Sequence, residues 1–149
     1  VIEYARNVLQ LPSANSVEMD EDTPNPVISL MDEQRKVANK GGTMRLGAWE
    51  CEVRKNTLLH KIYNSDHIEE RHRHRYEFND AYYEQFEKHG MIASGVNPET
   101  KLVEAVELLS HPWFVGVQYH PEYRSTVAQP HPLFVDFVNA CNNYAQSKK

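Results

Sequence analysis

The sequence has 149 residues, a formal net charge of −5 at neutral pH, 40% hydrophobic residues and 25% charged residues. These values are typical of one soluble globular domain with a modest core, and they disfavour a general nucleic-acid-binding protein. No apolar run approaches the length of a membrane span, and no signal peptide is visible. Cys51 and Cys141 are the only cysteines, too few and too widely spaced for a secreted disulfide framework, so we expect a cytoplasmic protein.

Helical spacing of apolar residues predicts a helix at the start of the chain, over residues 1–9. No Ser, Thr, Asp or Asn precedes it as a cap, so its first N–H groups would lack partners. We therefore interpret Val1 as the start of a truncated segment of a longer protein. An acidic loop at 18–26, a short strand at 27–31 and a polar, mobile loop at 32–42 are expected to follow.

The remaining elements are predicted from apolar periodicity and from Gly and Pro positions. We expect strands at 44–53 and 68–78, helices at 58–63 and 80–89, a hairpin of strands at 91–96 and 102–109, a buried strand at 114–119, and a helix at 133–144. Gly90 is expected to stop the second of these helices. In the last helix, Phe134, Phe137 and Val138 are predicted to face inward.

The segment His120-Pro121-Glu122 follows the short apolar run at 114–119. Pro121 ends the predicted strand because it has no N–H for the ladder. His120 is then a base at a strand end with the Glu122 carboxylate two residues away, which is the supporting part of a nucleophilic triad. The alternative is an ordinary turn, since so short a string also occurs by chance.

A basic run at 70–77 places His72, His74 and Tyr76 on one face of a strand and three arginines on the other. A solvated edge strand is the favoured interpretation. A metal site is the alternative, because His-x-His resembles the first cupin motif. The spacing to Glu77 is too short for that motif and the arginines would repel a cation, so no metal is expected.

The glycine-rich segment 41–47 carries Thr43 and Arg45 between its glycines. Glycine lets a backbone approach a ligand closely, and these two side chains could bind an anion. Without a lysine and a following helix the segment is not a P-loop, and the pattern alone favours a plain loop. The segment 14–18, which includes Glu18, is by itself only a capping-like polar turn.

Taken in chain order, the segments 1–7, 15–18, 41–47, 70–77 and 111–122 resemble the glutaminase domain of the CTP synthase family, within the class I glutamine amidotransferases. The resemblance runs nearly from end to end. It implies an α/β fold with a mainly parallel sheet, helices on both faces and an antiparallel hairpin. Residues 1–149 would be the C-terminal portion of an amidotransferase domain, with the nucleophile elbow and the synthase domain upstream of them.

The resemblance also implies roles for individual residues. His120 would be the general acid and base, and Glu122 would hold its imidazole. The remaining implied residues are Glu18 for the glutamine α-amino group, Arg75 with support from Arg73 for the α-carboxylate, and Thr43 and Arg45 in a lid linked to GTP activation. An arginine suits a carboxylate better than a lysine does, because its fork binds both oxygens.

The family's partners and cofactors follow from the same resemblance. Ammonia released from glutamine would pass to the synthase domain of the same polypeptide, which uses ATP and Mg²⁺ to aminate UTP. The parent protein would be a homotetramer, and this chain itself would hold no cofactor. Cys51 and Cys141 lack elbow glycines, so we expect the isolated chain to be inactive. A non-catalytic metal-binding module built on the His-rich strand is the alternative function.

Overall fold

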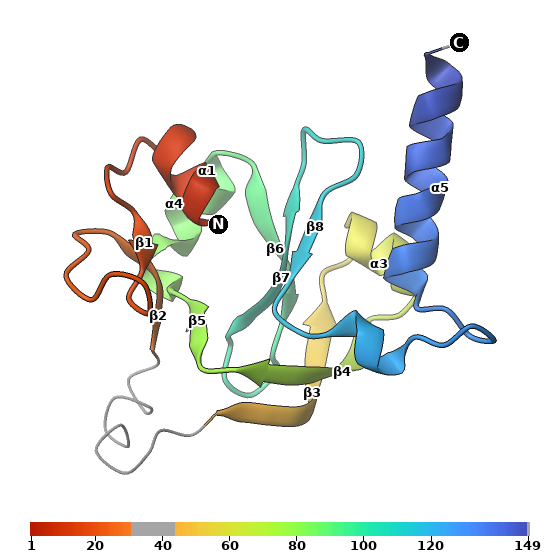
Figure 1. Cartoon of the computed structure of the whole chain (residues 1–149), viewed down its shortest axis with the longest axis horizontal. Helices are drawn as coiled ribbons and strands as arrows, with labels where there is room; N and C mark the ends of the chain where they lie inside the picture. The colour runs from red at the N-terminus through yellow and green to blue at the C-terminus, as the bar shows by residue number, and fades with distance from the viewer. Residues whose placement is uncertain (31–43, 149) are drawn as a thin grey trace.

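The computed structural model describes residues 1–30 and 44–148 (Figure 1). Its helices are α1 (Ile2–Asn7), α3 (Leu58–Tyr63), α4 (Tyr83–Lys88) and α5 (Pro132–Ser147), with short 3-10 helices η2 (Asp80–Tyr82) and η3 (Pro121–Arg124). Its strands are β1 (Asn15–Ser16), β2 (Pro26–Leu30), β3 (Arg45–Val53), β4 (His67–His74), β5 (Tyr76–Phe78), β6 (Met91–Val96), β7 (Val103–Leu108) and β8 (Val115–Val117). No helix of these described residues is long and apolar enough to span a bilayer.

Local sequence explains several element boundaries. The Thr57 side chain accepts a hydrogen bond from the His60 N–H and so caps α3, and Asn64 ends that helix in the left-handed conformation. Gly90 follows α4 with a φ of +99°, which confirms it as the stop of the predicted helix. The predicted strand at 114–119 is shorter than expected, because only Val115–Val117 pair with β7.

Two sheets carry the described strands. A five-stranded sheet has the order β4-β3-β6-β7-β8, and every neighbouring pair in it is antiparallel. A three-stranded sheet has the order β1-β2-β5, in which β1 and β2 are parallel and β2 and β5 antiparallel. The α/β class is confirmed, but the expectation of a mainly parallel sheet is wrong for this part of the chain. Short connections such as the one between β6 and β7 produce antiparallel neighbours, since a parallel pair needs a long crossover.

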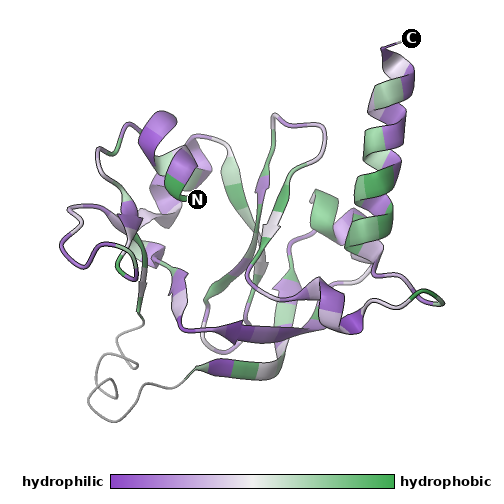
Figure 2. Cartoon of the chain, in the orientation of Figure 1, coloured by the Kyte–Doolittle hydropathy of each residue, from purple (hydrophilic) through white to green (hydrophobic). Residues whose placement is uncertain are grey.

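The core consists of two clusters on the five-stranded sheet. One joins α1, α4, β2 and β6 and contains the stacked rings of Tyr4 and Phe86. The other packs Leu59 of α3 and Leu133 of α5 against β3, β7 and Tyr119. Figure 2 shows the contrast between these apolar strands and β4, which is hydrophilic along most of its length.

Helix α5 differs from its prediction. Leu133 is its buried residue, whereas Phe134, Phe137 and Val138 are 42%, 49% and 55% exposed. The inward placement of these three side chains is therefore wrong for the described residues. The reason is geometric, because only the first turns of α5 contact α3 and the rest of the helix extends away from the sheets (Figure 1).

Candidate active site

His120 and Glu122 form a hydrogen-bonded pair at the end of the segment that follows β8. Nδ1 of His120 lies 2.7 Å from Oε1 of Glu122, and both side chains are partly exposed. The predicted contact between these residues is confirmed. A carboxylate can only accept, so Nδ1 carries the proton and Nε2 carries the lone pair. The pKa of Glu122 is lowered by its own backbone N–H and by the bond to His120.

The backbone around His120 fixes where the imidazole stands. The His120 N–H donates to the carbonyl of Arg71 on β4 at 2.8 Å, and Pro121 begins η3 directly afterwards. The Tyr123 ring stacks on the His120 ring with centroids 5.1 Å apart. Arg124 at the end of η3 donates to the backbone carbonyl of Glu69, so both ends of this turn are attached to β4 (Figure 1).

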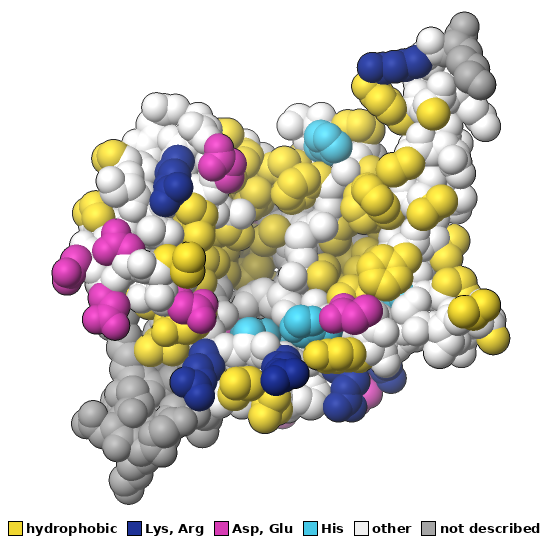
Figure 3. All heavy atoms as spheres, viewed as in Figure 1, with side chains coloured by type: hydrophobic (Ala, Val, Ile, Leu, Met, Phe, Trp, Pro, Cys, Tyr) yellow, Lys and Arg dark blue, Asp and Glu magenta, His cyan; other side chains and the backbone are white. Residues whose placement is uncertain are grey.

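An open depression of about 910 Å³ lies beside this turn. It is lined by Met44, Leu46, Gly47, Arg71, His72, Arg73 and Tyr123. On the face drawn in Figure 3, histidine side chains lie next to an acidic side chain, and Lys or Arg and hydrophobic side chains alternate along the edge below them. Since Tyr123 lines the depression and stacks on His120, the imidazole stands at its edge, as predicted.

Glu18 and Arg75 both belong to the neighbourhood of the three-stranded sheet. Glu18 follows β1, and its N–H donates to the Ser16 hydroxyl, while Arg75 lies between β4 and β5. Both residues are exposed. The neighbouring strands, β1 beside Glu18 and β5 beside Arg75, are the two edges of that sheet, and β2 lies between them. Their joint approach to an amino acid ligand stays a prediction.

Of the two residues predicted to belong to a lid, Thr43 and Arg45, the structure describes only Arg45. Thr43 lies outside the described residues. Arg45 is the first residue of β3, within the strand predicted at 44–53, and is only 5% exposed. Its place in a lid stays a prediction. Its guanidinium is held inside by Glu104, with Nη2 2.5 Å from Oε1, and it lies over the Trp49 ring at 4.6 Å. The strand was predicted, but the burial of Arg45 and its contact with Glu104 were not.

Arg45 belongs to a buried cluster that the sequence did not reveal, formed by Arg45, His72, His74, Glu77 and Glu104. His72 and His74 do share the inner face of β4, as the alternation predicted, and their Nδ1 and Nε2 atoms are 2.7 Å apart. Glu104 comes from β7, 59 residues after Arg45. No local pattern signals such a contact; the exposed arginines on the other face were the only visible hint.

The buried cluster contains neutral histidines. Burial lowers the pKa of His72 to about 3 and that of His74 to about 4, with the Arg45 guanidinium adding to both shifts. Burial also raises the pKa of Glu77 to about 7. Nδ1 of His72 is hydrogen-bonded to His74. The described residues contain no group of three or more His, Cys, Asp or Glu arranged to hold a metal.

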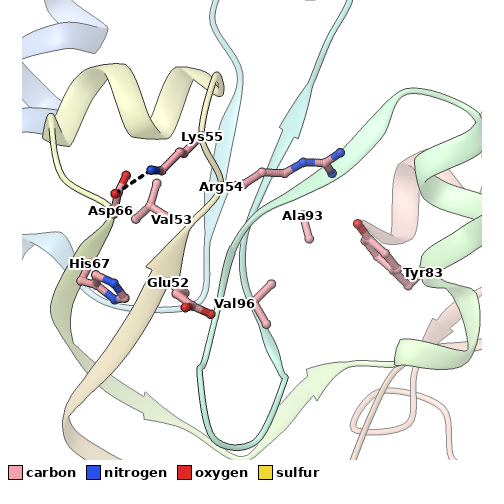
Figure 4. Close-up of a pocket in the computed structure, with 9 residues that line it drawn as sticks. All are labelled: Glu52, Val53, Arg54, Lys55, Asp66, His67, Tyr83, Ala93 and Val96. Carbon is pink, nitrogen blue, oxygen red and sulfur yellow. Dashed lines mark ion pairs between the residues drawn. The ribbon is translucent and has the colours of Figure 1, made fainter.

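A second depression, of about 410 Å³, lies at the opposite end of β3 and has none of this chemistry (Figure 4). Three of its charged side chains are paired: Lys55 with Asp66 at 3.1 Å, and Arg54 with Glu87 outside the lining at 2.6 Å. The Lys55–Asp66 pair is exposed to solvent and contributes little energy. The geometry of His120 and Glu122 therefore distinguishes the first depression as the candidate active site.

Comparison with known families agrees with this geometry. The family model "Glutamine amidotransferase class-I" matches residues 1–140. This chain belongs to the class I glutamine amidotransferase family. The class I amidotransferase fold that the sequence predicted is thereby confirmed as well.

Individual relatives of this amidotransferase chain are more specific. It is 62% identical over 149 residues to a CTP synthase of Christiangramia forsetii and 57% identical over 143 residues to one of Aquifex aeolicus. These alignments cover 100% and 96% of this chain but only 27% of each relative. A solved structure of the Trypanosoma brucei CTPS glutaminase domain with bound acivicin superposes with a TM-score of 0.89 at 41% identity, covering 96% of this chain and 56% of that one.

Neither cysteine of this amidotransferase chain is suited to be a nucleophile. Cys51 lies inside β3 and is 1% exposed, and burial raises the pKa of its thiol to about 12. A nucleophilic cysteine must form a thiolate near neutral pH. Cys141 is exposed in α5, a regular helix rather than a strand-to-helix elbow.

Proposed function

We propose that this chain is part of the glutaminase domain of a CTP synthase, in which His120 and Glu122 support a cysteine nucleophile. The observation that carries the proposal is the 2.7 Å pair of His120 and Glu122 at the edge of an open depression. The identity of 57–62% with CTP synthases along almost the whole chain supports this choice within the amidotransferase family.

The chemistry follows from the tautomer of His120. Nε2 of His120 first takes the proton of the cysteine thiol. The resulting thiolate attacks the side-chain amide carbon of glutamine, and Nε2 passes that proton to the departing nitrogen, so that ammonia leaves and a thioester remains. The same Nε2 then takes a proton from water, whose oxygen attacks the thioester to release glutamate and restore the thiolate. Glu122 keeps Nδ1 protonated and stabilises the imidazolium in each step.

The proposed nucleophile is a cysteine outside residues 1–149, since Cys51 is buried as a thiol and Cys141 is on a helix. Substrate recognition is assigned to charges of opposite sign. A glutamine zwitterion needs an anion for its α-amino group and a forked cation for its α-carboxylate, and Glu18 and Arg75 are the proposed pair. Arg73, which faces outward on β4, is a supporting candidate.

The full-length protein is proposed to carry a synthase domain that uses ATP and Mg²⁺ to form CTP from UTP and ammonia, with GTP as activator. It would work as a cytoplasmic homotetramer. In this proposal residues 1–149 hold neither nucleotide nor metal; their contribution is glutamine binding and proton transfer. The metal-binding alternative has no support in the described residues, because His72 and His74 bond to each other.

The test compares two nitrogen sources in the full-length protein that contains this chain. Unaltered protein should form CTP from either glutamine or ammonia. His120→Ala should lower the glutamine-dependent rate by about 10⁴-fold and leave the ammonia-dependent rate unchanged. His111→Ala, which alters another exposed histidine, is the matched control and should leave both rates unchanged. Equal loss of both reactions in His120→Ala would show that His120 is structural and contradict the proposal.

A further inference from the structure

Two buried polar side chains stand on either side of the residue that anchors His120. The His120 N–H bonds to the carbonyl of Arg71, and the neighbours of Arg71 on β4 are Glu70 and His72, which are 3% and 2% exposed. Because side chains alternate along a strand, both neighbours point inward while Arg71 points outward. The catalytic turn is thus bonded to the backbone of β4 between two inward-facing polar groups.

Glu70 is held by donors from two other elements. Its Oε1 lies 2.8 Å from Nε2 of His131, the residue that caps α5, and 2.9 Å from the hydroxyl of Tyr63 at the end of α3. Nδ1 of His131 accepts from the Leu133 N–H, so Nε2 carries the proton and donates to Glu70. The carboxylate therefore joins β4 to α3 and α5.

Tyr119, the residue before His120, contacts both sides of this arrangement. Its hydroxyl lies 3.2 Å from that of Tyr63. Tyr63 gives its single proton to the carboxylate, so the Tyr119 hydroxyl donates to Tyr63. The Tyr119 ring meets the edge of the His72 ring with centroids 5.9 Å apart.

The free-energy cost of burying the Glu70 carboxylate indicates that this residue serves to position its neighbours. Glu70 is a buried carboxylate whose bonded partners are neutral groups, and its Oε2 has no hydrogen-bond partner among the described residues. A packed apolar side chain would avoid the desolvation penalty of such a group. Unlike an apolar side chain, a carboxylate accepts hydrogen bonds, and here it fixes the directions of two of them.

We propose that Glu70 is a positioning residue for His120: with Tyr63 and His131 it fixes the register between β4 and the segment Tyr119–Glu122, and so the place of the imidazole. This inference rests on the proposed function for its catalytic consequence. Its structural part, the attachment of the His120 amide to Arg71, stands independently of any activity.

The experiment uses Glu70→Gln and Tyr63→Phe in the full-length protein. Glu70→Gln keeps the shape but weakens both hydrogen bonds, and Tyr63→Phe removes one of them without touching the carboxylate. Glu50→Gln, an exposed position on β3, and Tyr144→Phe, an exposed position on α5, are the matched controls. If Glu70→Gln fails to fold, Tyr63→Phe still tests the inference.

Two readouts are needed. The first is steady-state kinetics, where each variant should lower the glutamine-dependent kcat by about 10-fold, because a displaced base reacts slowly, with the glutamine KM and the ammonia-dependent rate unchanged. The second is hydrogen exchange at the His120 amide, which should be about 10-fold faster in each variant than in unaltered protein and controls.

The outcomes separate the two proposals. An unchanged His120 amide in both variants, or equal loss of the glutamine and ammonia reactions, would overturn the positioning role. Unaltered protein that hydrolyses no glutamine would refute the proposed function instead, and the exchange measurement would still decide whether Glu70 holds the His120 segment.

Discussion

Two regions of this molecule pair histidine with a carboxylate, and they are built for opposite purposes. His120 and Glu122 meet on an exposed turn, two residues apart, with a contact of 2.7 Å. His72 and Glu104 approach to 3.6 Å with both side chains fully buried, inside the buried cluster with Arg45, His74 and Glu77. The exposed pair lies next to Tyr123, which lines an open depression, whereas the two side chains of the buried pair expose no surface to solvent.

The difference lies in solvation. A buried imidazole cannot easily gain a charge, which is why the pKa of His72 falls to about 3 and it stays neutral throughout the physiological range. A general acid and base must change its charge in each catalytic cycle. The same pair of residue types is therefore proposed to serve catalysis at the surface, whereas in the interior it belongs to the packed structure, and the two roles predict different responses to substitution.

The largest expected effect concerns the chain of 149 residues by itself. We expect it to release no measurable glutamate from glutamine although it contains His120 and Glu122, because a base without its nucleophile loses on the order of 10⁴-fold in rate or more. Glutamate release by the purified chain is the measurement, made before and after alkylation of Cys51 and Cys141. Robust turnover that alkylation abolishes would show that one of these two thiols is the nucleophile.

The exposed pair could be predicted from sequence because its information is local. A spacing of two places Glu122 beside His120, and Pro121 begins η3, although the predicted strand before it already ends at Val117. The helix at 58–63 and the strand at 91–96 were likewise predicted at their observed bounds, since caps and apolar runs lie within each segment. Alternation along β4 correctly placed His72 and His74 on one face, although it did not show that this face is buried.

What the sequence could not provide is the identity of distant partners. The sequence predicted the strand that contains Arg45 but not the burial of its guanidinium, which depends on Glu104, 59 residues away. The predicted inward face of α5 was wrong for a similar reason. Amphipathic spacing shows that a helix has an apolar side, but not that another element covers that side. The direction of strand pairing also depends on which strands become neighbours.

Glu104→Gln should have the largest effect in the buried cluster. It removes the negative charge that lies 2.5 Å from the buried Arg45 guanidinium, and Glu77 is 4.0 Å away, so it should lower the free energy of unfolding by about 3 kcal/mol. Chemical denaturation of the purified chain measures this value. Glu50→Gln on the exposed side of β3 is the control, and an equal effect of both substitutions would contradict the ion-pair role.

Glu122→Gln should show the reverse pattern. In the full-length protein it should lower the glutamine-dependent kcat by about 10²-fold, because an amide neither fixes the tautomer of His120 nor stabilises the imidazolium as a carboxylate does. The free energy of unfolding of the chain should stay the same, since the Glu122 side chain is 54% exposed. Lost stability with retained activity would reverse the roles assigned to the two regions.

Arg75→Lys tests the proposed substrate site with a smaller effect. A lysine keeps the charge but not the fork, so the KM for glutamine should rise about 10-fold with kcat little changed. The same substitution at Arg54, an exposed residue of the second depression, is the control for loss of a surface guanidinium. An unchanged KM in Arg75→Lys would remove Arg75 from the glutamine site.

The smallest effect is the pH dependence of stability, in which the members of the buried cluster act with opposite signs. The pKa of His72 falls from 6.5 to about 3, so between these values the unfolded chain binds more protons and stability decreases as the pH is lowered. The pKa of Glu77 rises from 4.5 to about 7, so its contribution is fully present below 4.5 and is lost as the pH rises through 7. Between pH 6.5 and 4.5 the two trends oppose each other.

His72→Gln should therefore weaken the loss of stability on acidification, and Glu77→Gln should make that loss steeper. The change in slope is at most about 1.4 kcal/mol per pH unit for a group that titrates in only one state. Denaturation of the purified chain at about pH 6.5, 5.5 and 4.5 gives the slopes, because both groups contribute to the pH dependence within this range. His111→Gln, on an exposed ring, is the control. Parallel slopes for His72→Gln and unaltered chain would mean that His72 is not held neutral by burial, and the contrast between the two histidine–carboxylate pairs would fail.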